Sequence, residues 1–141
     1  MTKSIAKIWA IVPAAGQGQR FSDVQPKQFF ELNGQLIAEH SLSRLLAVPQ
    51  IEKIIVPSDI EAILWSQIPS INHSKIRQVQ GGEQRAHSVL NGLLAIDQEA
   101  SDNDWVLVHD IARPCITTDD INKLILLVKD HSVGGILVAR V

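Results

Sequence analysis

The chain has 141 residues, 45% of them apolar and 20% charged, which is ordinary usage for one globular domain. Its formal net charge of −2 excludes a strongly basic surface, so we expect no nucleic-acid partner. No apolar run approaches the ~18 residues of a membrane span, so we expect no membrane partner either. Cys115 is the only cysteine, which excludes an internal disulfide and leads us to expect a cytoplasmic location.

The first half of the chain predicts strands and helices in alternation. Residues 7–12 form a short run rich in Ile and Val, which predicts a buried strand. After a Gly-containing loop, Asn33-Gly34 predicts a tight turn. Helical spacing of apolar residues predicts a helix over 38–47. Residues 51–56 predict a second strand, and a turn then leads into a short helix over 59–64.

The second half continues the same alternation. Residues 76–80 predict a third strand, and 105–108 a fourth. Thr117 or Thr118 is expected to cap a helix that runs to about Lys129, and 136–141 predict a fifth strand. A helix is also predicted over 84–96, with an apolar face supplied by Val89, Leu90, Leu93, Leu94 and Ile96.

This alternation predicts an α/β fold, a Rossmann-like and mostly parallel sheet with helices on both faces. We expect residues 1–141 to form a single nucleotide-binding domain. Because the last predicted strand is apolar and no polar tail follows it, we also expect the domain to be truncated at its C-terminal end.

The loop from Pro13 to Arg20 follows the first strand, where parallel sheets bind ligands. Its small residues let the backbone approach a ligand, and successive N–H groups can bind an anion. Arg20 and Lys27 could add positive charge. The loop is neither a Walker A loop nor a dinucleotide fingerprint, because Gly-Lys-Ser/Thr is missing and Phe21 occupies the place of the third glycine. The alternative is a plain strand-to-helix turn.

Two further strand ends carry unusual residues. Gly81-Gly82 allows close approach to a planar base, with Ser88 in the first turn of the next helix; the alternative is an ordinary loop. Asp110 follows a buried apolar strand, where a carboxylate requires a cation or hydrogen-bond donors. Asp110 is therefore a candidate Mg²⁺ ligand. The alternative is a cap, or an ion-pair partner of Arg113.

In combination and in order, these segments resemble the 2-C-methyl-D-erythritol 4-phosphate cytidylyltransferases. The motifs that carry the resemblance are Val12-Pro13-Ala14-Ala15-Gly16-x-Gly18-x-Arg20, Pro26-Lys27-Gln28, Glu39-His40-Ser41, Gly81-Gly82-x-x-Arg85-x-x-Ser88 and Leu107-Val108-His109-Asp110-x-Ala112-Arg113-Pro114. The resemblance implies a fold of the nucleotide-diphospho-sugar transferase type. It also implies transfer of CMP from CTP to 2-C-methyl-D-erythritol 4-phosphate, a small polyol phosphate, with release of pyrophosphate, in isoprenoid precursor biosynthesis.

The resemblance further implies roles for individual residues. Arg20 and Lys27 would be catalytic, Asp110 would hold Mg²⁺, and Arg113 would contact the methylerythritol phosphate across the interface of a homodimer. The nucleotide contacts implied are Pro13, Ala14, Ala15, Gly16, Gly18, Gly81, Gly82, Glu83, Arg85, Ser88 and Asp110.

The chain departs from the family at four points, one of which is the stretch from Val56 to Trp65, shorter and differently composed than usual. Glu83 replaces the usual Asp, and Ile111 replaces the usual Ala, which would place a bulky side chain beside the ribose. Family members also extend beyond Val141, so we expect a nucleotide-binding fragment with weak or no activity. Two alternatives remain open from the sequence: a ribitol phosphate or sugar phosphate nucleotidyltransferase, and a non-catalytic nucleotide-binding module.

Overall fold

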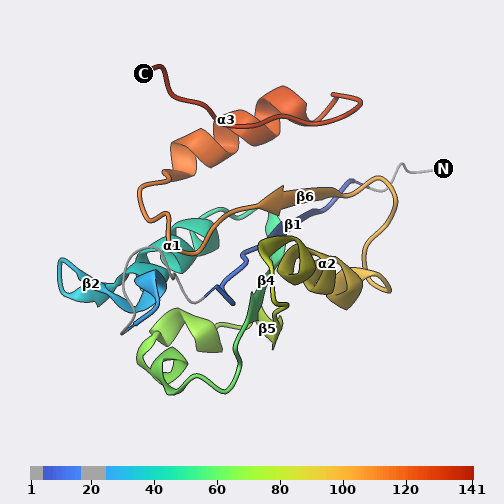
Figure 1. Ribbon diagram of the computed structural model, residues 1–141. Helices are drawn as coiled ribbons and strands as arrows, with labels where there is room; N and C mark the ends of the chain where they lie inside the picture. The colour runs from blue at the N-terminus through green and yellow to red at the C-terminus, as the bar shows by residue number, and fades with distance from the viewer. Residues whose placement is uncertain (1–4, 17–24) are drawn as a thin grey trace.

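The computed structural model describes residues 5–16 and 25–141. Strands and helices alternate along it, as the sequence predicted (Figure 1). The elements are β1 (Ile8–Ile11), η1 (Lys27–Phe29), β2 (Glu31–Leu32), β3 (Gln35–Leu36), α1 (Ile37–Leu46), β4 (Ile51–Ser58), η2 (Ile63–Gln67), η3 (Pro69–Asn72), β5 (Ile76–Gln80), α2 (Arg85–Ile96), β6 (Trp105–Val108) and α3 (Thr118–Val128). No helix within these described ranges has both the length and the apolar character needed to cross a membrane.

The main sheet is parallel, with the strand order β5-β4-β1-β6 in the described residues. The strand β1 lies at its centre, where Ala10 pairs with Ile54 of β4 on one side and with Leu107 of β6 on the other. All four β1 residues are buried. This is the pattern of a strand covered on both faces by helices, and it confirms the predicted fold class.

Helices cover both faces of the sheet (Figure 1). On one face, α1 contributes Leu42 and Leu45 to the larger apolar core, which also contains Ile121 of α3. On the other face, Ile96 of α2 packs with Trp9 of β1 in a smaller core. Because neighbouring strand residues point to opposite faces, β1 supplies side chains to both cores.

The predicted apolar face of α2 is only partly correct. Ile96 is buried, but Leu90 and Leu94 are 51% and 63% exposed. The face that meets the sheet is formed instead by Ser88, Gly92 and Ile96, which are spaced four residues apart. A Cβ atom on Gly92 would lie 2.7 Å from Cγ2 of Ile11. The helix therefore lies so close to β1 that it turns its small residues inward and leaves its leucines outside.

The hairpin between β2 and β3 has the predicted tight turn. Asn33 and Gly34 have φ angles of 51° and 80°, the left-handed pair that a type I′ turn requires. The carbonyl oxygen of Leu32 lies 2.6 Å from Nε2 of His40, which ties the hairpin to α1.

The helix predicted over 59–64 is wrong. Strand β4 runs two residues further than predicted and includes Pro57 and Ser58. Asp59 then accepts a hydrogen bond from the backbone N–H of Glu61, 3.2 Å from Oδ1. An Asp side chain that pairs with the backbone two residues ahead competes with helix formation. The chain therefore turns first and becomes helical only in the 3₁₀ segment η2.

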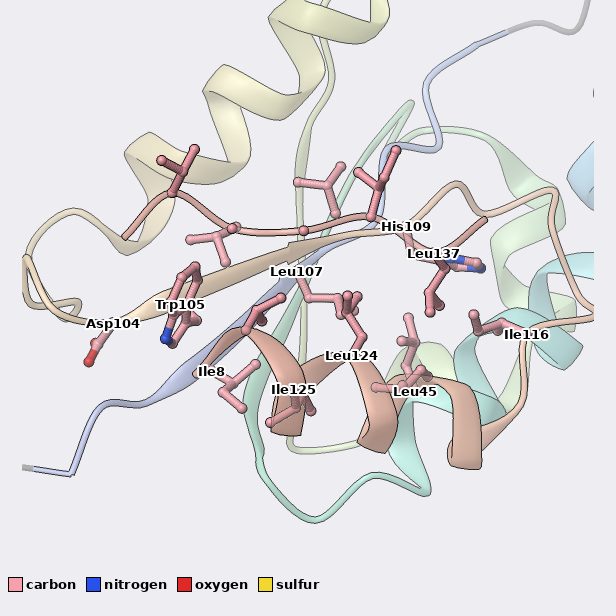
Figure 2. A pocket seen from close by; sticks show the side chains of 18 of the residues that line it. Ile8, Leu45, Asp104, Trp105, Leu107, His109, Ile116, Leu124, Ile125 and Leu137 are labelled. Atoms are coloured by element: carbon pink, nitrogen blue, oxygen red, sulfur yellow. The ribbon is translucent and has the colours of Figure 1, made fainter. Parts of the chain in front are cut away.

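The fifth strand predicted over 136–141 is also wrong, because this segment has no strand pairing in the described structure. An apolar cavity of about 820 Å³ lies between β6, α3 and residues 133–137, and Leu137 lines it (Figure 2). Ile136 and Val138 are 82% and 81% exposed. Apolar composition favours an extended strand, but a strand forms only where a neighbouring backbone accepts its hydrogen bonds.

Asp104 fastens the amino-terminal ends of β1 and β6 together. Its Oδ2 accepts from Nε1 of Trp9 at 2.9 Å and from the N–H of Ser101 at 3.0 Å. Its Oδ1 accepts from the N–H of Lys7 at 2.9 Å and from Oγ of Ser101 at 3.1 Å. Burial alone would raise the pKa of the Asp104 carboxyl, but these hydrogen bonds outweigh it and lower the pKa from 3.8 to about 2.

We expect Asp104→Asn to destabilise the fold by about 1–3 kcal/mol at neutral pH, because an amide has one acceptor atom and must leave a donor unpaired. Urea unfolding checks this, with the exposed neighbour Asp102→Asn as the control. The folded pKa is depressed, so the contribution of Asp104 is complete above pH 3.8 and is lost as the pH falls through about 2. A difference from the parent chain that stays constant over this range would contradict the assignment.

Candidate functional site

A cavity of about 1100 Å³ lies at the carboxyl ends of the strands. It brings together most of the residues that the sequence singled out, from four separate segments of the chain. Of the predicted residues, those that line it are Pro13, Ala14, Ala15, Gly16, Lys27, Gly82, Glu83, Arg85, Ser88, Asp110 and Arg113. Gly81 lies directly behind Ala15, while Gly18 and Arg20 fall outside the described residues.

The first wall of the cavity is the loop after β1. The N–H of Ala14 donates to the carbonyl of Pro57 at 2.8 Å, which extends the pairing of β1 with β4 into the loop. Nε2 of Gln28 donates to the carbonyl of Ala14 at 3.0 Å. Lys27 begins the 3₁₀ turn η1 after Pro26, and this turn places it on the same cavity as the loop.

The second wall is the segment from Gly81 to Ser88. The N–H of Gly81 donates to the carbonyl of Ser58 at 2.9 Å, and a Cβ atom on Gly81 would lie 2.2 Å from Cβ of Ala15. Only glycine fits at this contact. Oγ of Ser88 accepts from the N–H of Gly82 at 3.0 Å, so the hydroxyl holds the glycine turn against the start of α2.

Asp110 forms the third wall and pairs with two arginines. Nε of Arg85 lies 2.8 Å from its Oδ1, and Nε of Arg113 lies 3.2 Å from its Oδ2. Burial would raise the pKa of the Asp110 carboxyl, but the hydrogen bonds and charges of the two arginines outweigh it and hold the pKa below its usual value. The ion pair with Arg113 was an open alternative in the sequence. Arg85 is 25 residues away in the chain, and no local pattern connects it with Asp110.

Ile111 is among the residues that line the cavity, but most of its side chain is buried. Its side chain is 3% exposed and belongs to the larger apolar core. Its N–H donates to the carbonyl of Pro13 at 3.5 Å, and its carbonyl accepts from Oγ of Ser41 at 2.5 Å. Backbone pairing and a buried hydroxyl therefore direct this side chain inward, and the aliphatic core accommodates it.

Two polar residues near the cavity, Gln28 and Ser41, received no role from the sequence. Both are buried, and each donates to a backbone carbonyl of a cavity loop. Both belong to motifs that carry the family resemblance, Pro26-Lys27-Gln28 and Glu39-His40-Ser41. That position in a motif was the available signal, but their partners lie 14 and 70 residues away and could not be identified without the fold.

The charge of the cavity suits an anion. Lys27, Arg85 and Arg113 are cationic, whereas Glu83 and Asp110 are anionic, so the described lining carries one net positive charge. The arginines are 59% and 76% exposed in their ion pairs. Exposed ion pairs contribute little to stability, about 0–1 kcal/mol, so a phosphate can compete with Asp110 for these guanidinium groups.

The cavity lining contains two carboxylates, Glu83 and Asp110, and Asp110 is the one that the sequence predicts as a metal ligand. The described residues contain no group of three or more His, Cys, Asp or Glu side chains able to hold a metal. Mg²⁺, however, often binds through one or two carboxylates together with substrate phosphates and water. Asp110 therefore fits Mg²⁺ only as part of a metal–phosphate complex, in which the arginines no longer occupy both of its oxygens.

Comparison with known proteins agrees with the residue pattern. The family model for 2-C-methyl-D-erythritol 4-phosphate cytidylyltransferase matches residues 8–141. The enzyme of that name from Vibrio vulnificus is 40% identical over 141 residues, which are 100% of this chain and 60% of the relative. The one from Pseudomonas fluorescens is 41% identical over 138 residues, 97% of this chain and 59% of the relative. The chain thus spans about 60% of the length of these curated relatives.

Solved structures give the same result. The Francisella tularensis 2-C-methyl-D-erythritol 4-phosphate cytidylyltransferase superposes with a TM-score of 0.73 and 38% identity, over 90% of this chain and 54% of that one. A 4-diphosphocytidyl-2C-methyl-D-erythritol synthase superposes with a TM-score of 0.80 and 28% identity, over 96% of this chain and 60% of that one. Family model, relatives and folds agree, and the chain belongs to the 2-C-methyl-D-erythritol 4-phosphate cytidylyltransferase family.

Proposed function

We propose that this chain provides the CTP-binding part of a cytidylyltransferase that transfers CMP to 2-C-methyl-D-erythritol 4-phosphate. The observation that carries the proposal is the single cavity shared by the loop 13–16, Lys27, Gly82, Ser88 and Asp110. Family membership supports the reaction class, and the net positive lining supports a phosphate-bearing ligand.

In the proposed reaction, an oxygen of the acceptor phosphate attacks the α-phosphorus of CTP. A new P–O bond forms as the bond from the α-phosphorus to the bridging oxygen breaks, and that electron pair leaves with pyrophosphate. Such a transfer needs positioning and charge stabilisation rather than a covalent nucleophile. Lys27 and Arg20 are proposed to stabilise charge on the α-phosphate, while the loop amides hold the triphosphate.

The remaining residues are proposed to bind the two ends of the reactants. Gly82, Glu83 and Ser88 would face the cytosine, and Arg113 the acceptor phosphate. Asp110 would hold Mg²⁺, which when bound supplies positive charge against the phosphate oxygens. We also propose a cytoplasmic location and, for a longer form, a homodimer; both rest on the sequence and the family resemblance.

Calorimetry with CTP, UTP, ATP and GTP, each with and without Mg²⁺, tests nucleotide binding directly. The proposal predicts saturable binding of CTP, tighter than binding of the purine triphosphates, in one-to-one stoichiometry. Lys27→Ala should weaken it, whereas the exposed Lys123→Ala on α3, outside the cavity, should not. An unchanged chain that does not bind CTP would refute the proposal.

Asp110→Asn separates the metal role from the ion-pair role. If Asp110 holds Mg²⁺, the variant should bind CTP about fivefold more weakly in Mg²⁺, at the low end of ordinary coupling between sites, and equally well or better without it. The second effect follows because Arg85 and Arg113 lose their counter-charge and become available to the phosphates. Weakening of equal size with and without Mg²⁺ would contradict the metal role.

Turnover by these 141 residues alone is expected to be slight, because the curated relatives are longer and the acceptor contacts are proposed to lie largely in their additional length. A steady-state pyrophosphate-release assay with CTP, Mg²⁺ and 2-C-methyl-D-erythritol 4-phosphate checks this expectation. Robust turnover would contradict it and show that these 141 residues are sufficient for the transfer.

A further inference from the structure

Two buried side chains each donate a hydrogen bond to one backbone carbonyl of a cavity loop, and one of them, Gln28, also belongs to the cavity lining. Gln28 of η1 is 5% exposed and donates from Nε2 to the carbonyl of Ala14 at 3.0 Å. Ser41 of α1 is fully buried and donates from Oγ to the carbonyl of Ile111 at 2.5 Å. We propose that Gln28 and Ser41 are positioning residues that orient two peptide groups, so that the N–H groups of Ala15 and Ala112 face the cavity and bind phosphate oxygen.

The orientation follows from the geometry of the peptide bond. The described residues contain no cis peptide, so the carbonyl of Ala14 and the N–H of Ala15 point in opposite directions, as do the carbonyl of Ile111 and the N–H of Ala112. Both carbonyls point to the buried side, toward Gln28 and Ser41. Both N–H groups therefore point away from that side, and Ala15 and Ala112 line the cavity.

The two N–H groups lie in the loops that follow the neighbouring strands β1 and β6, just beyond the point where backbone pairing between them ends. The backbone bond from Ile111 to the carbonyl of Pro13 is the last between β1 and β6 in the described chain. Beyond it, the N–H of Ala14 is taken by Pro57 of β4. In the described structure, the N–H groups of Ala15 and Ala112 have no recorded hydrogen bond. Two free N–H donors beside a cavity with net positive charge can bind the oxygen of an anion.

The two side chains matter because either peptide could otherwise rotate. A rotated peptide would present its carbonyl oxygen to the phosphate, so an attraction would become a repulsion between two acceptors. A donor to the carbonyl on the buried side holds each peptide in the productive orientation before the ligand arrives. Such preorganisation is the usual source of electrostatic stabilisation in phosphoryl transfer sites. This inference rests on the proposed function for its ligand, but not for the peptide orientation itself.

The experiment compares the unchanged 141-residue chain with four variants and a matched control variant. Gln28→Met removes the amide donor at similar length, and Ser41→Ala removes the hydroxyl, while Ser41→Thr retains it. Glu39→Gln is the control, because Glu39 is a buried polar residue of the same helix that accepts from the N–H of Ser70 at 3.0 Å and from its Oγ at 2.6 Å. The fourth variant combines Gln28→Met with Ser41→Ala.

Two readouts separate orientation from binding. Residual dipolar couplings of the Ala15 and Ala112 N–H vectors in the ligand-free chain should change at Ala15 in Gln28→Met and at Ala112 in Ser41→Ala. Calorimetry should show CTP and inorganic pyrophosphate bound about tenfold or more weakly by each single variant, the range for hydrogen bonds to charged groups. Ser41→Thr should retain the Ala112 couplings, and Glu39→Gln should lower the unfolding temperature without changing either affinity.

Unchanged couplings in both Gln28→Met and Ser41→Ala would overturn the inference, whatever happens to stability. Changed couplings with unchanged affinity would also overturn it, because the oriented N–H groups would then not bind the phosphates. If the unchanged chain binds neither CTP nor pyrophosphate, the proposed function fails and the phosphate role with it, while the couplings still decide whether Gln28 and Ser41 orient the two peptides.

Discussion

Replacing Lys27 with alanine should lower kcat by roughly 10²-fold or more, the scale observed when a preorganised charge-stabilising group is removed. The reason is that charge builds on the phosphate oxygens as the reaction proceeds, so a fixed cation there stabilises the transition state more than the ground state. Lys27 lies on the same cavity as the loop 13–16, at the start of a short helical turn that fixes its backbone. Arg20 falls outside the described residues, and we expect Arg20→Ala to lower kcat by a similar factor.

The measurement needs a form of the protein with the additional length found in the relatives, assayed by pyrophosphate release at saturating CTP. Lys123→Ala removes an exposed lysine of α3 and should leave the rate unchanged. Lys27→Arg should recover part of the rate, because it keeps the charge but changes its shape and reach. A Lys27→Ala enzyme with the parent kcat would refute the role proposed for this residue.

Gly81→Ala should weaken CTP binding by at least tenfold and destabilise the chain by about 1–3 kcal/mol, the usual cost of overpacking. The added Cβ would lie 2.2 Å from Cβ of Ala15 and 3.2 Å from the backbone nitrogen of Ser58. Neither atom is the end of a flexible side chain, so the backbone of the loop must move. That loop carries the amides proposed to hold the triphosphate, and a displacement of even 1 Å is costly at a preorganised site.

Gly92→Ala is the matched control for this variant. Its Cβ would also clash, 2.7 Å from Cγ2 of Ile11, but this contact lies between α2 and the sheet and outside the cavity lining. It should reduce the free energy of unfolding without reducing affinity for CTP at a temperature where both variants are folded. Equal losses of affinity in the two variants would indicate a general effect of destabilisation rather than a displaced loop.

The sequence predicted the architecture well because the order of elements determines it. Once strands and helices alternate, a parallel sheet brings the ends of its strands to one edge, so segments around Gly16, Gly82 and Asp110 meet without any knowledge of contacts. The type and order of these elements follow from the local spacing of apolar residues, which is clear in most of the sequence. The same reasoning predicts the position of the cavity at the carboxyl ends of the strands.

The helix predicted over 59–64 failed for a local reason, the hydrogen bond from Glu61 to Asp59, but the other details that failed depend on distant partners. Leu90 and Leu94 read as a buried face, but a close crossing at Gly92 turns them outward. Residues 136–141 have strand composition but find no backbone to pair with in the described structure. The sequence offered Arg113 as a partner of Asp110, but not Arg85, which is 25 residues away. None of these long-range outcomes is encoded within a window of ten residues, because each is decided by how separate elements come together.

The two faces of the sheet each contain a tryptophan, and this gives the protein a built-in optical probe on either side. Trp9, 1% exposed, belongs to the core beneath α2, whereas Trp65, 4% exposed, belongs to the core beneath α1 and meets Phe29 edge to face at 5.0 Å between ring centroids. Chains that retain only one of these indoles, and in which Trp105 is also replaced because it packs against the larger core, would report the melting of one face each. Coincident fluorescence transitions would mean that both halves of the sheet open in one cooperative event.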